Sequence, residues 1–119
     1  MTKPLVFIIE DDNKIRSIMT IALKNDFKVE AFEDGAASLE RLYTETPAMI
    51  FLDLHLPKVS GEEILLKINS DERLKNIPVI IATADYLQAN ALRDYAEMVL
   101  VKPISPIQLL ELTKNICGI

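Results

Sequence analysis

The feature that most constrains the fold is a regular alternation of strand-like and helix-like segments along the chain. Residues 5–9, 48–52, 78–82 and 97–101 are short, almost wholly apolar runs, which is typical of parallel strands buried on both faces. Residues 28–32 alternate apolar and polar side chains, so we place that run at a sheet edge. The alternation predicts five βα repeats, forming a parallel sheet with helices on both faces.

Between these runs, apolar residues recur with the spacing of amphipathic helices. The expected core-facing stripes are Ile15, Ile18, Met19 and Ala22; Leu39, Leu42 and Tyr43; Ile64, Leu65 and Ile68; Leu87, Ala91, Leu92 and Tyr95; and Leu109, Leu112 and Ile116. Asn13 and Asp34 are suited to cap the first two helices, and Pro106 suits the first turn of the last. Ile107 and Leu110 form a second stripe, which belongs either to a broad core face or to a partner contact.

Composition bounds the class of protein. The 119 residues suffice for one core, so we expect a single domain over residues 1–119. A net charge of −5 without a basic cluster argues against direct nucleic-acid binding by this domain. No apolar stretch approaches the roughly 20 residues that span a bilayer, and no signal-peptide pattern is present. With the single cysteine Cys117, these features predict a cytoplasmic protein without membrane contact.

Polar residues stand directly after four of the apolar runs. They are Glu10 and Asp11, Asp53, Thr83 and Lys102. In an open parallel sheet, ligands bind beyond the carboxyl ends of the strands, where the strand order reverses. If the second strand lies on one side of the first and the later strands on the other, Asp11 and Asp53 become neighbours. Two such charges about 5 Å apart repel by roughly 3 kcal/mol at an effective dielectric near 20, so a hard cation such as Mg²⁺ is the expected partner.

The ordered set of these motifs resembles the receiver domain of response regulators, the phosphoacceptor module of two-component signalling. The resemblance covers essentially the whole chain and rests on Ile9-Glu10-Asp11-Asp12, Phe51-Leu52-Asp53-Leu54-His55-Leu56-Pro57, Gly61, Ile81-Ala82-Thr83-Ala84 and Val101-Lys102-Pro103. It implies a doubly wound, flavodoxin-like (βα)5 fold with strand order 2-1-3-4-5. It also implies a role in a phosphorelay, of the kind used in bacterial signalling.

By this resemblance, Asp53 is the phosphorylated residue. Asp11, Asp53 and the backbone carbonyl of His55 would hold Mg²⁺, and Glu10 would act through a coordinated water. The phosphoryl group would come from a sensor histidine kinase, a phosphotransfer protein or a small phosphodonor. The domain would be no enzyme in the usual sense, because it would catalyse only its own phosphorylation and dephosphorylation.

The resemblance also assigns the residues around the phosphoryl group. Thr83 and Lys102 would contact it, and the bond before Pro103 is expected to be cis, since X-Pro bonds prefer trans only slightly. His55 and Asp85 stand at variable positions that would tune the phosphorylation and hydrolysis rates. The signal would pass through the fourth helix and fifth strand to an unknown output protein or attached domain. A homodimer through the face from the fourth to the fifth helix is a further expectation.

Three departures from the family pattern fall in the output region. The interval from Thr83 to Lys102 is short by about one helical turn, at about 3.6 residues per turn, so the fourth helix or its entry loop should be shortened. Val99 replaces a customary aromatic residue, and Tyr95 replaces a customary glycine. The usual coupling of the threonine to a rotating aromatic ring therefore cannot operate unchanged.

Four other interpretations compete with this one. Asp11 and Asp12 could simply cap the first helix. A Mg²⁺-dependent phosphatase of the haloacid-dehalogenase type would need Asp and Thr where this chain has His55 and Pro57. A flavin- or nucleotide-binding module would need a glycine-rich loop, but the chain has three glycines in all. A degenerate receiver used only for protein docking is the last alternative.

Overall fold

The computed structural model describes residues 2–119, which form a five-stranded parallel sheet with the order β2-β1-β3-β4-β5. The strands are β1 (Leu5–Ile9), β2 (Lys28–Phe32), β3 (Met49–Asp53), β4 (Val79–Thr83) and β5 (Met98–Val101). The helices are α1 (Asn13–Leu23), α2 (Gly35–Leu42), α3 (Gly61–Ser70), α4 (Tyr86–Leu92) and α5 (Pro106–Cys117), with a 3₁₀ turn, η1 (Arg93–Tyr95). The predicted fold class and strand order are confirmed.

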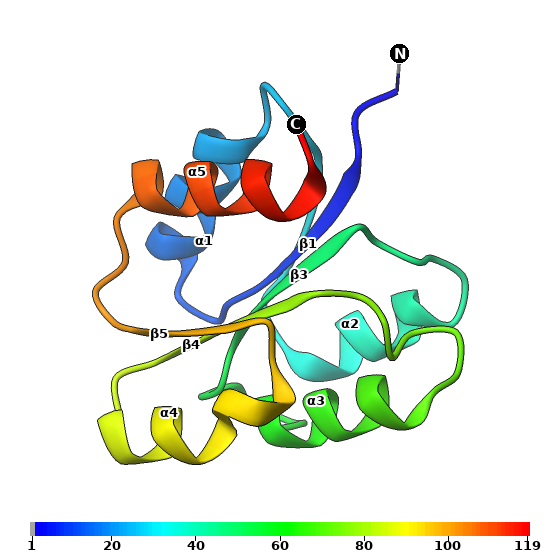
Figure 1. Ribbon diagram of the computed structural model, residues 1–119, viewed down its shortest axis with the longest axis vertical. Helices are drawn as coiled ribbons and strands as arrows, with labels where there is room; N and C mark the ends of the chain where they lie inside the picture. The colour runs from blue at the N-terminus through cyan, green and yellow to red at the C-terminus, as the bar shows by residue number, and fades with distance from the viewer. Residues whose placement is uncertain (1) are drawn as a thin grey trace.

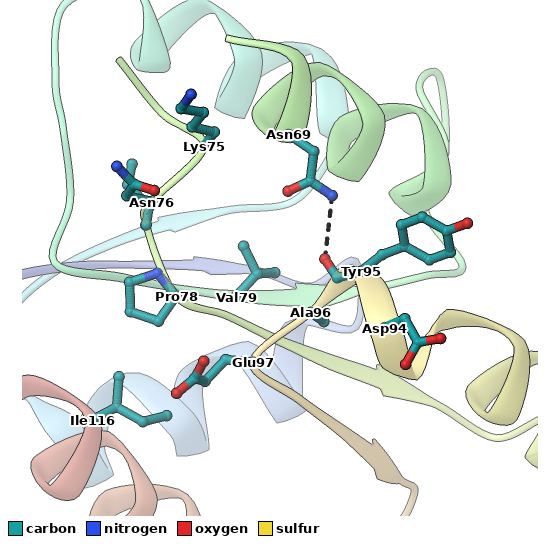
Figure 2. A pocket seen from close by; sticks show the side chains of 11 residues that line it. Asn69, Lys75, Asn76, Pro78, Val79, Asp94, Tyr95, Ala96, Glu97 and Ile116 are labelled. Carbon is teal, nitrogen blue, oxygen red and sulfur yellow. Dashed lines mark hydrogen bonds between the residues drawn. The ribbon is translucent and has the colours of Figure 1, made fainter. Parts of the chain in front are cut away.

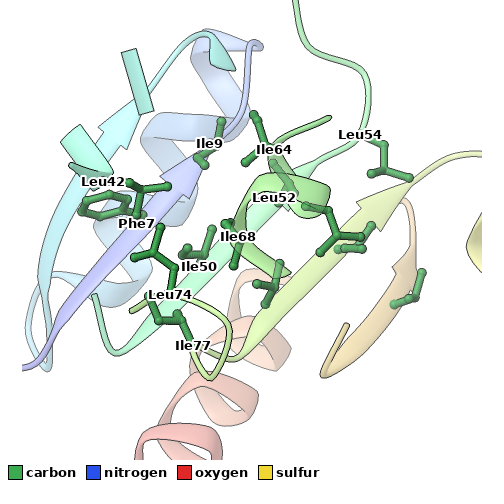
Figure 3. Close-up of a cluster of buried hydrophobic side chains, with 14 of the residues drawn as sticks. Phe7, Ile9, Leu42, Ile50, Leu52, Leu54, Ile64, Ile68, Leu74 and Ile77 are labelled. Atoms are coloured by element: carbon green, nitrogen blue, oxygen red, sulfur yellow. The ribbon is translucent and has the colours of Figure 1, made fainter. Parts of the chain in front are cut away.

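The helices cover the sheet in two layers: α1 and α5 lie on one face, and α2, α3 and α4 on the other (Figure 1). Because successive strand residues point to opposite faces, β1 contributes to both cores. Val6 and Ile8 pack towards α1 and α5, whereas Phe7 and Ile9 pack towards α2 and α3. Figure 3 shows this second core, in which Ile64 of α3 meets the strand side chains. The central strands are thus buried on both sides, as their apolar sequences predict.

Several local expectations were wrong. β5 is an edge strand, so Val101 is exposed rather than doubly buried. The N-cap of α1 is Asp12, not Asn13, because the Asp12 carboxylate accepts from the backbone N–H of Ile15 at 2.9 Å. Four residues assigned to core-facing stripes are at least half exposed: Ile18, Tyr43, Leu87 and Tyr95. Asp34 caps α2 and Pro106 begins α5, as expected.

Among the helices of residues 2–119, α4 is the shortest, with seven residues. It continues into η1, whose last residue is tied to α3 by a hydrogen bond of 3.2 Å from Asn69 Nδ2 to the carbonyl of Tyr95 (Figure 2). None of the helices in residues 2–119 combines the length and the apolar character needed to cross a bilayer. The short α4 agrees with the short interval between Thr83 and Lys102.

Candidate functional site

The strand-end residues meet at one edge of the sheet, because β1, β3 and β4 are successive neighbours and all strands run parallel. Glu10 follows β1, and Asp53 is the last residue of β3. Carboxylate oxygens of Glu10, Asp11 and Asp53 lie within 4.8 Å of one another. Glu10 and Asp53 are almost fully buried, whereas Asp11 is exposed, so the cluster opens to solvent on one side.

Lys102 reaches this cluster from the residue after β5. Its Nζ lies 3.2 Å from Oδ2 of Asp53 and 3.3 Å from Oε1 of Glu10. Oδ1 of Asp53 accepts a hydrogen bond of 3.2 Å from the backbone N–H of His55. The Lys102–Pro103 peptide bond is cis. Each carboxylate oxygen of Asp53 therefore lies beside either the ammonium group of Lys102 or a backbone hydrogen-bond donor.

The electrostatic balance of the cluster shifts two pKa values. Burial, followed by the hydrogen bond and charge of Asp53, raises the pKa of Glu10 to about 7, although the Asp12 N–H and Lys102 oppose the shift. For Lys102, burial lowers the pKa, but the charges of Asp53 and Glu10 outweigh it and the net pKa is raised. One ammonium thus contacts two of the three carboxyl groups in the cluster. The oxygen-only donor set fits a hard divalent cation.

Thr83 is buried at the end of β4, next to the carboxylate cluster. Its Oγ1 accepts from the backbone N–H of Asp85 at 3.1 Å and lies 3.2 Å from Oε1 of Gln88. Asp85 is exposed and caps α4 by accepting from the backbone N–H of Leu87 and Gln88. His55 is also exposed. Gln88 was not predicted as a site residue, and its place in the first turn of α4 is its only signal in the sequence.

Two further residues shape the site through contacts that the sequence did not predict. Arg16 of α1 donates from Nη1 to the carbonyls of Glu10 at 2.8 Å and Asp11 at 3.4 Å, which fixes the loop after β1. Gly61 begins α3 against the end of β3: a Cβ there would lie 2.7 Å from the carbonyl oxygen of Asp53. Gly61 is part of the family motif, but sequence spacing reveals neither its close packing against Asp53 nor the hydrogen bonds of Arg16.

A surface cavity of about 710 Å³ lies at the opposite end of the strands from the carboxylate cluster, where β4 and β5 begin. Figure 2 shows its lining, which includes Asn69, Lys75 and Glu97. It contains none of the residues of the carboxylate cluster. The cavity is therefore separate from the candidate site.

The fold and the carboxylate cluster together define a class of parallel α/β domain with an acidic site at the carboxyl ends of its strands, and sequence comparison gives the family. Residues 6–114 match the sequence model of the family described as response regulator receiver domain. The chain belongs to this family, which confirms the resemblance stated from the motifs.

Named relatives occur both as short regulators and inside large kinases. Two-component response regulator ORR5 of Oryza sativa subsp. japonica is 30% identical over 118 residues, covering 95% of this chain and 88% of the relative. Hybrid signal transduction histidine kinase D of Dictyostelium discoideum is 33% identical over 122 residues, covering 96% of this chain but 8% of the kinase. Sensor histidine kinase TmoS of Ectopseudomonas mendocina, 27% identical over 96% of this chain, is matched over 12% of its length.

Solved structures repeat the fold. The bacteriophytochrome response regulator RtBRR has a TM-score of 0.84 and 28% identity, covering 99% of this chain and 80% of that one. The receiver domain of sensor histidine kinase PA1611 from Pseudomonas aeruginosa PAO1 has a TM-score of 0.88 and 21% identity, over 98% and 99% of the two chains. Its description places a magnesium ion in its active-site cleft. Because relatives include rice and Dictyostelium proteins, a bacterial setting stays a prediction.

Proposed function

We propose that residues 1–119 form one receiver domain that accepts a phosphoryl group on Asp53, with Mg²⁺, and signals through protein contacts. The observation that carries this proposal is the setting of Asp53: a buried carboxylate, 3.2 Å from Lys102, within a cluster completed by Glu10 and Asp11. A buried carboxylate with a fixed ammonium beside it is arranged for attack on a phosphorus centre rather than for packing.

The residues present fit a magnesium ion. Asp11, Asp53 and the backbone carbonyl of His55 would hold it, with Glu10 reached through a water. When bound, Mg²⁺ would neutralise charge on the phosphoryl oxygens and on the attacking carboxylate. The carboxylate cluster and the magnesium described for the PA1611 receiver domain support this assignment.

The chain's own residues then carry out the transfer. An oxygen of Asp53 attacks the phosphorus of a phosphohistidine or a small phosphodonor in line with the leaving atom, and the bond to that atom breaks with its electron pair. Lys102, whose pKa is raised, stays protonated and offers its charge to the phosphoryl oxygens. The Thr83 hydroxyl donates to another of these oxygens. Water later hydrolyses the acyl phosphate, at a rate that His55 and Asp85 would tune from their exposed positions.

The partners follow from this chemistry. We expect a sensor histidine kinase or phosphotransfer protein as the donor and an output protein or attached domain as the receiver of the signal, in the cytoplasm. A homodimer through the face formed by α4, β5 and α5 remains a proposal, supported by exposed apolar side chains on each element: Leu87, Val101 and Ile107. Sedimentation before and after phosphorylation would test it.

The decisive experiment is intact-mass spectrometry after incubation with Mg²⁺ and acetyl phosphate or phosphoramidate. We expect one phosphate-sized mass gain in the native protein. The gain should disappear in Asp53→Asn and when the metal is chelated. If neither donor nor a phosphorylated histidine kinase domain labels the protein while Mg²⁺ still binds, the docking-module alternative replaces this proposal.

A further inference from the structure

We infer that Gln88 is a positioning residue that holds the hydroxyl proton of Thr83 and so sets how readily the phosphorylated state forms. The inference rests on the proposed function, because the competing acceptor is the phosphoryl group on Asp53. Gln88 belongs to no motif of the family resemblance, and its role follows from contacts that this chain makes.

The hydrogen-bond chain fixes the direction of every donor. Nε2 of Gln88 lies 2.6 Å from Oε1 of Glu62, in the first turn of α3. A carboxylate can only accept, so the amide nitrogen must face Glu62 and the amide oxygen must face Thr83. That oxygen lies 3.2 Å from Thr83 Oγ1, and it has no proton to give. Thr83 is therefore the donor in this bond.

A threonine hydroxyl has one proton, and in this structure the proton is engaged by Gln88. The oxygen itself accepts from the backbone N–H of Asp85 at 3.1 Å. A phosphoryl oxygen on Asp53 can receive only the proton that Gln88 now holds. The two acceptors compete, and the phosphorylated state must break the bond between Thr83 and Gln88.

Breaking this bond also changes how two helices are joined. Gln88 belongs to α4 and Glu62 to α3, so the amide links both helices to the end of β4. Val99, on the neighbouring strand β5, offers no hydroxyl or aromatic ring that could serve as the alternative relay. The change at Thr83 is accordingly transmitted to the α3–α4 side of the molecule.

The test measures binding of beryllofluoride, which mimics a phosphoryl group on the aspartate, with Mg²⁺ by NMR titration. Gln88→Leu keeps the size of the side chain but cannot accept the Thr83 proton. Its affinity should rise about 2- to 13-fold, the equivalent of about 0.5–1.5 kcal/mol for one net hydrogen bond. Glu62→Ala should give a smaller rise in the same direction. Gln108→Leu, at an exposed glutamine of α5, should leave the affinity unchanged.

Two variants separate positioning from general stability. In a Thr83→Val background, Gln88→Leu should have no effect, because no proton remains to compete for. In the double variant Glu62→Gln with Gln88→Glu, Thr83 can still donate to residue 88, and the second bond is rebuilt in reverse, with the amide of residue 62 donating to the carboxylate of residue 88. Its affinity should return to the native value or below. Urea midpoints of all variants would report folding.

The outcomes are distinguishable. Suppose that the native protein binds beryllofluoride through Asp53 but Gln88→Leu has the same effect in the Thr83 and Thr83→Val backgrounds. This result would overturn the role of Gln88 and leave the proposed function standing. A native protein that neither binds beryllofluoride nor gains phosphate would overturn the proposed function and this inference with it.

Discussion

Gly61 leaves room for the backbone that carries Asp53. A Cβ at this position would lie 2.6 Å from Leu54 Cα and 2.7 Å from the Asp53 carbonyl oxygen, and neither backbone atom can move aside freely. We predict that Gly61→Ala destabilises the protein by about 1–3 kcal/mol, as overpacking typically does, and slows phosphate gain at Asp53. Urea unfolding and intact-mass kinetics would measure the two effects.

Gly118 is the matched control for this prediction. It has a φ of +74° at the end of α5, and no atom lies within 4 Å of a Cβ built there. Gly118→Ala should cost about 1 kcal/mol through its left-handed backbone and leave the phosphorylation rate unchanged. Equal rates for Gly61→Ala and the native protein would contradict the role assigned to the close approach.

At the residue scale, strand-end positions were sufficient to predict the carboxylate cluster and its lysine. Asp53 and Lys102 follow apolar runs, and parallel strands bring their carboxyl ends to one edge, so spacing alone implies proximity. Gln88 could not be found this way. Its partner Glu62 is 26 residues away on another helix, and the contact depends on which side of α4 faces β4.

Among the elements, α1 offers a direct test of helix capping. The structure assigns the cap to Asp12, whose carboxylate bonds the Ile15 N–H, and places Asn13 inside the helix. Asp12→Ala should lower the free energy of unfolding by about 0.5–2 kcal/mol, the usual loss of an N-cap. Asn13→Ala should cost less, since within residues 2–119 the side chain of Asn13 accepts one hydrogen bond, from the Arg16 side chain, and none from the helix backbone. The reverse order in urea unfolding would restore the sequence-based assignment.

Element boundaries and exposures were harder to predict than element types. The apolar run at 97–101 reads like a buried strand, yet β5 is at the edge because no further strand follows in residues 2–119. The expected stripe of α4 failed for a different reason. Ala89, not Leu87, is buried, and a helix of seven residues is too short for periodicity to show which face turns to the core.

For the whole molecule, the carboxylate cluster links stability to pH and to metal. Glu10 has a pKa of about 7 when folded, against 4.5 as its ordinary value, so the folded state binds the proton more tightly. By linkage, its contribution to the free energy of unfolding is full below pH 4.5 and is lost as the pH rises through 7. The free energy of unfolding of the metal-free protein should therefore fall as the pH rises from about 5 to about 8.

Magnesium should reverse this trend, because a metal binds the deprotonated carboxylates. At about 100 times its Kd, Mg²⁺ should add about 2.7 kcal/mol, or about 10 °C in Tm, at pH 8 and much less at pH 5. Thermal unfolding at both pH values, with Mg²⁺ or with chelator, measures this. Glu10→Gln should flatten the metal-free pH dependence. A magnesium effect of equal size at both pH values would speak against a site at these carboxylates.

The short edge strand β5 has a consequence for self-association. Exposed strand edges are templates on which further chains can add, and proteins guard them with short strands, charges and prolines. β5 offers a ladder of four residues, and Lys102 and then Pro103, which has no backbone N–H, follow directly. The segment that places Lys102 in the site therefore also ends the strand edge on which another chain could pair. Copies of this domain cannot extend one another's sheets far at this edge, which protects a protein that works by meeting partners from uncontrolled polymerisation.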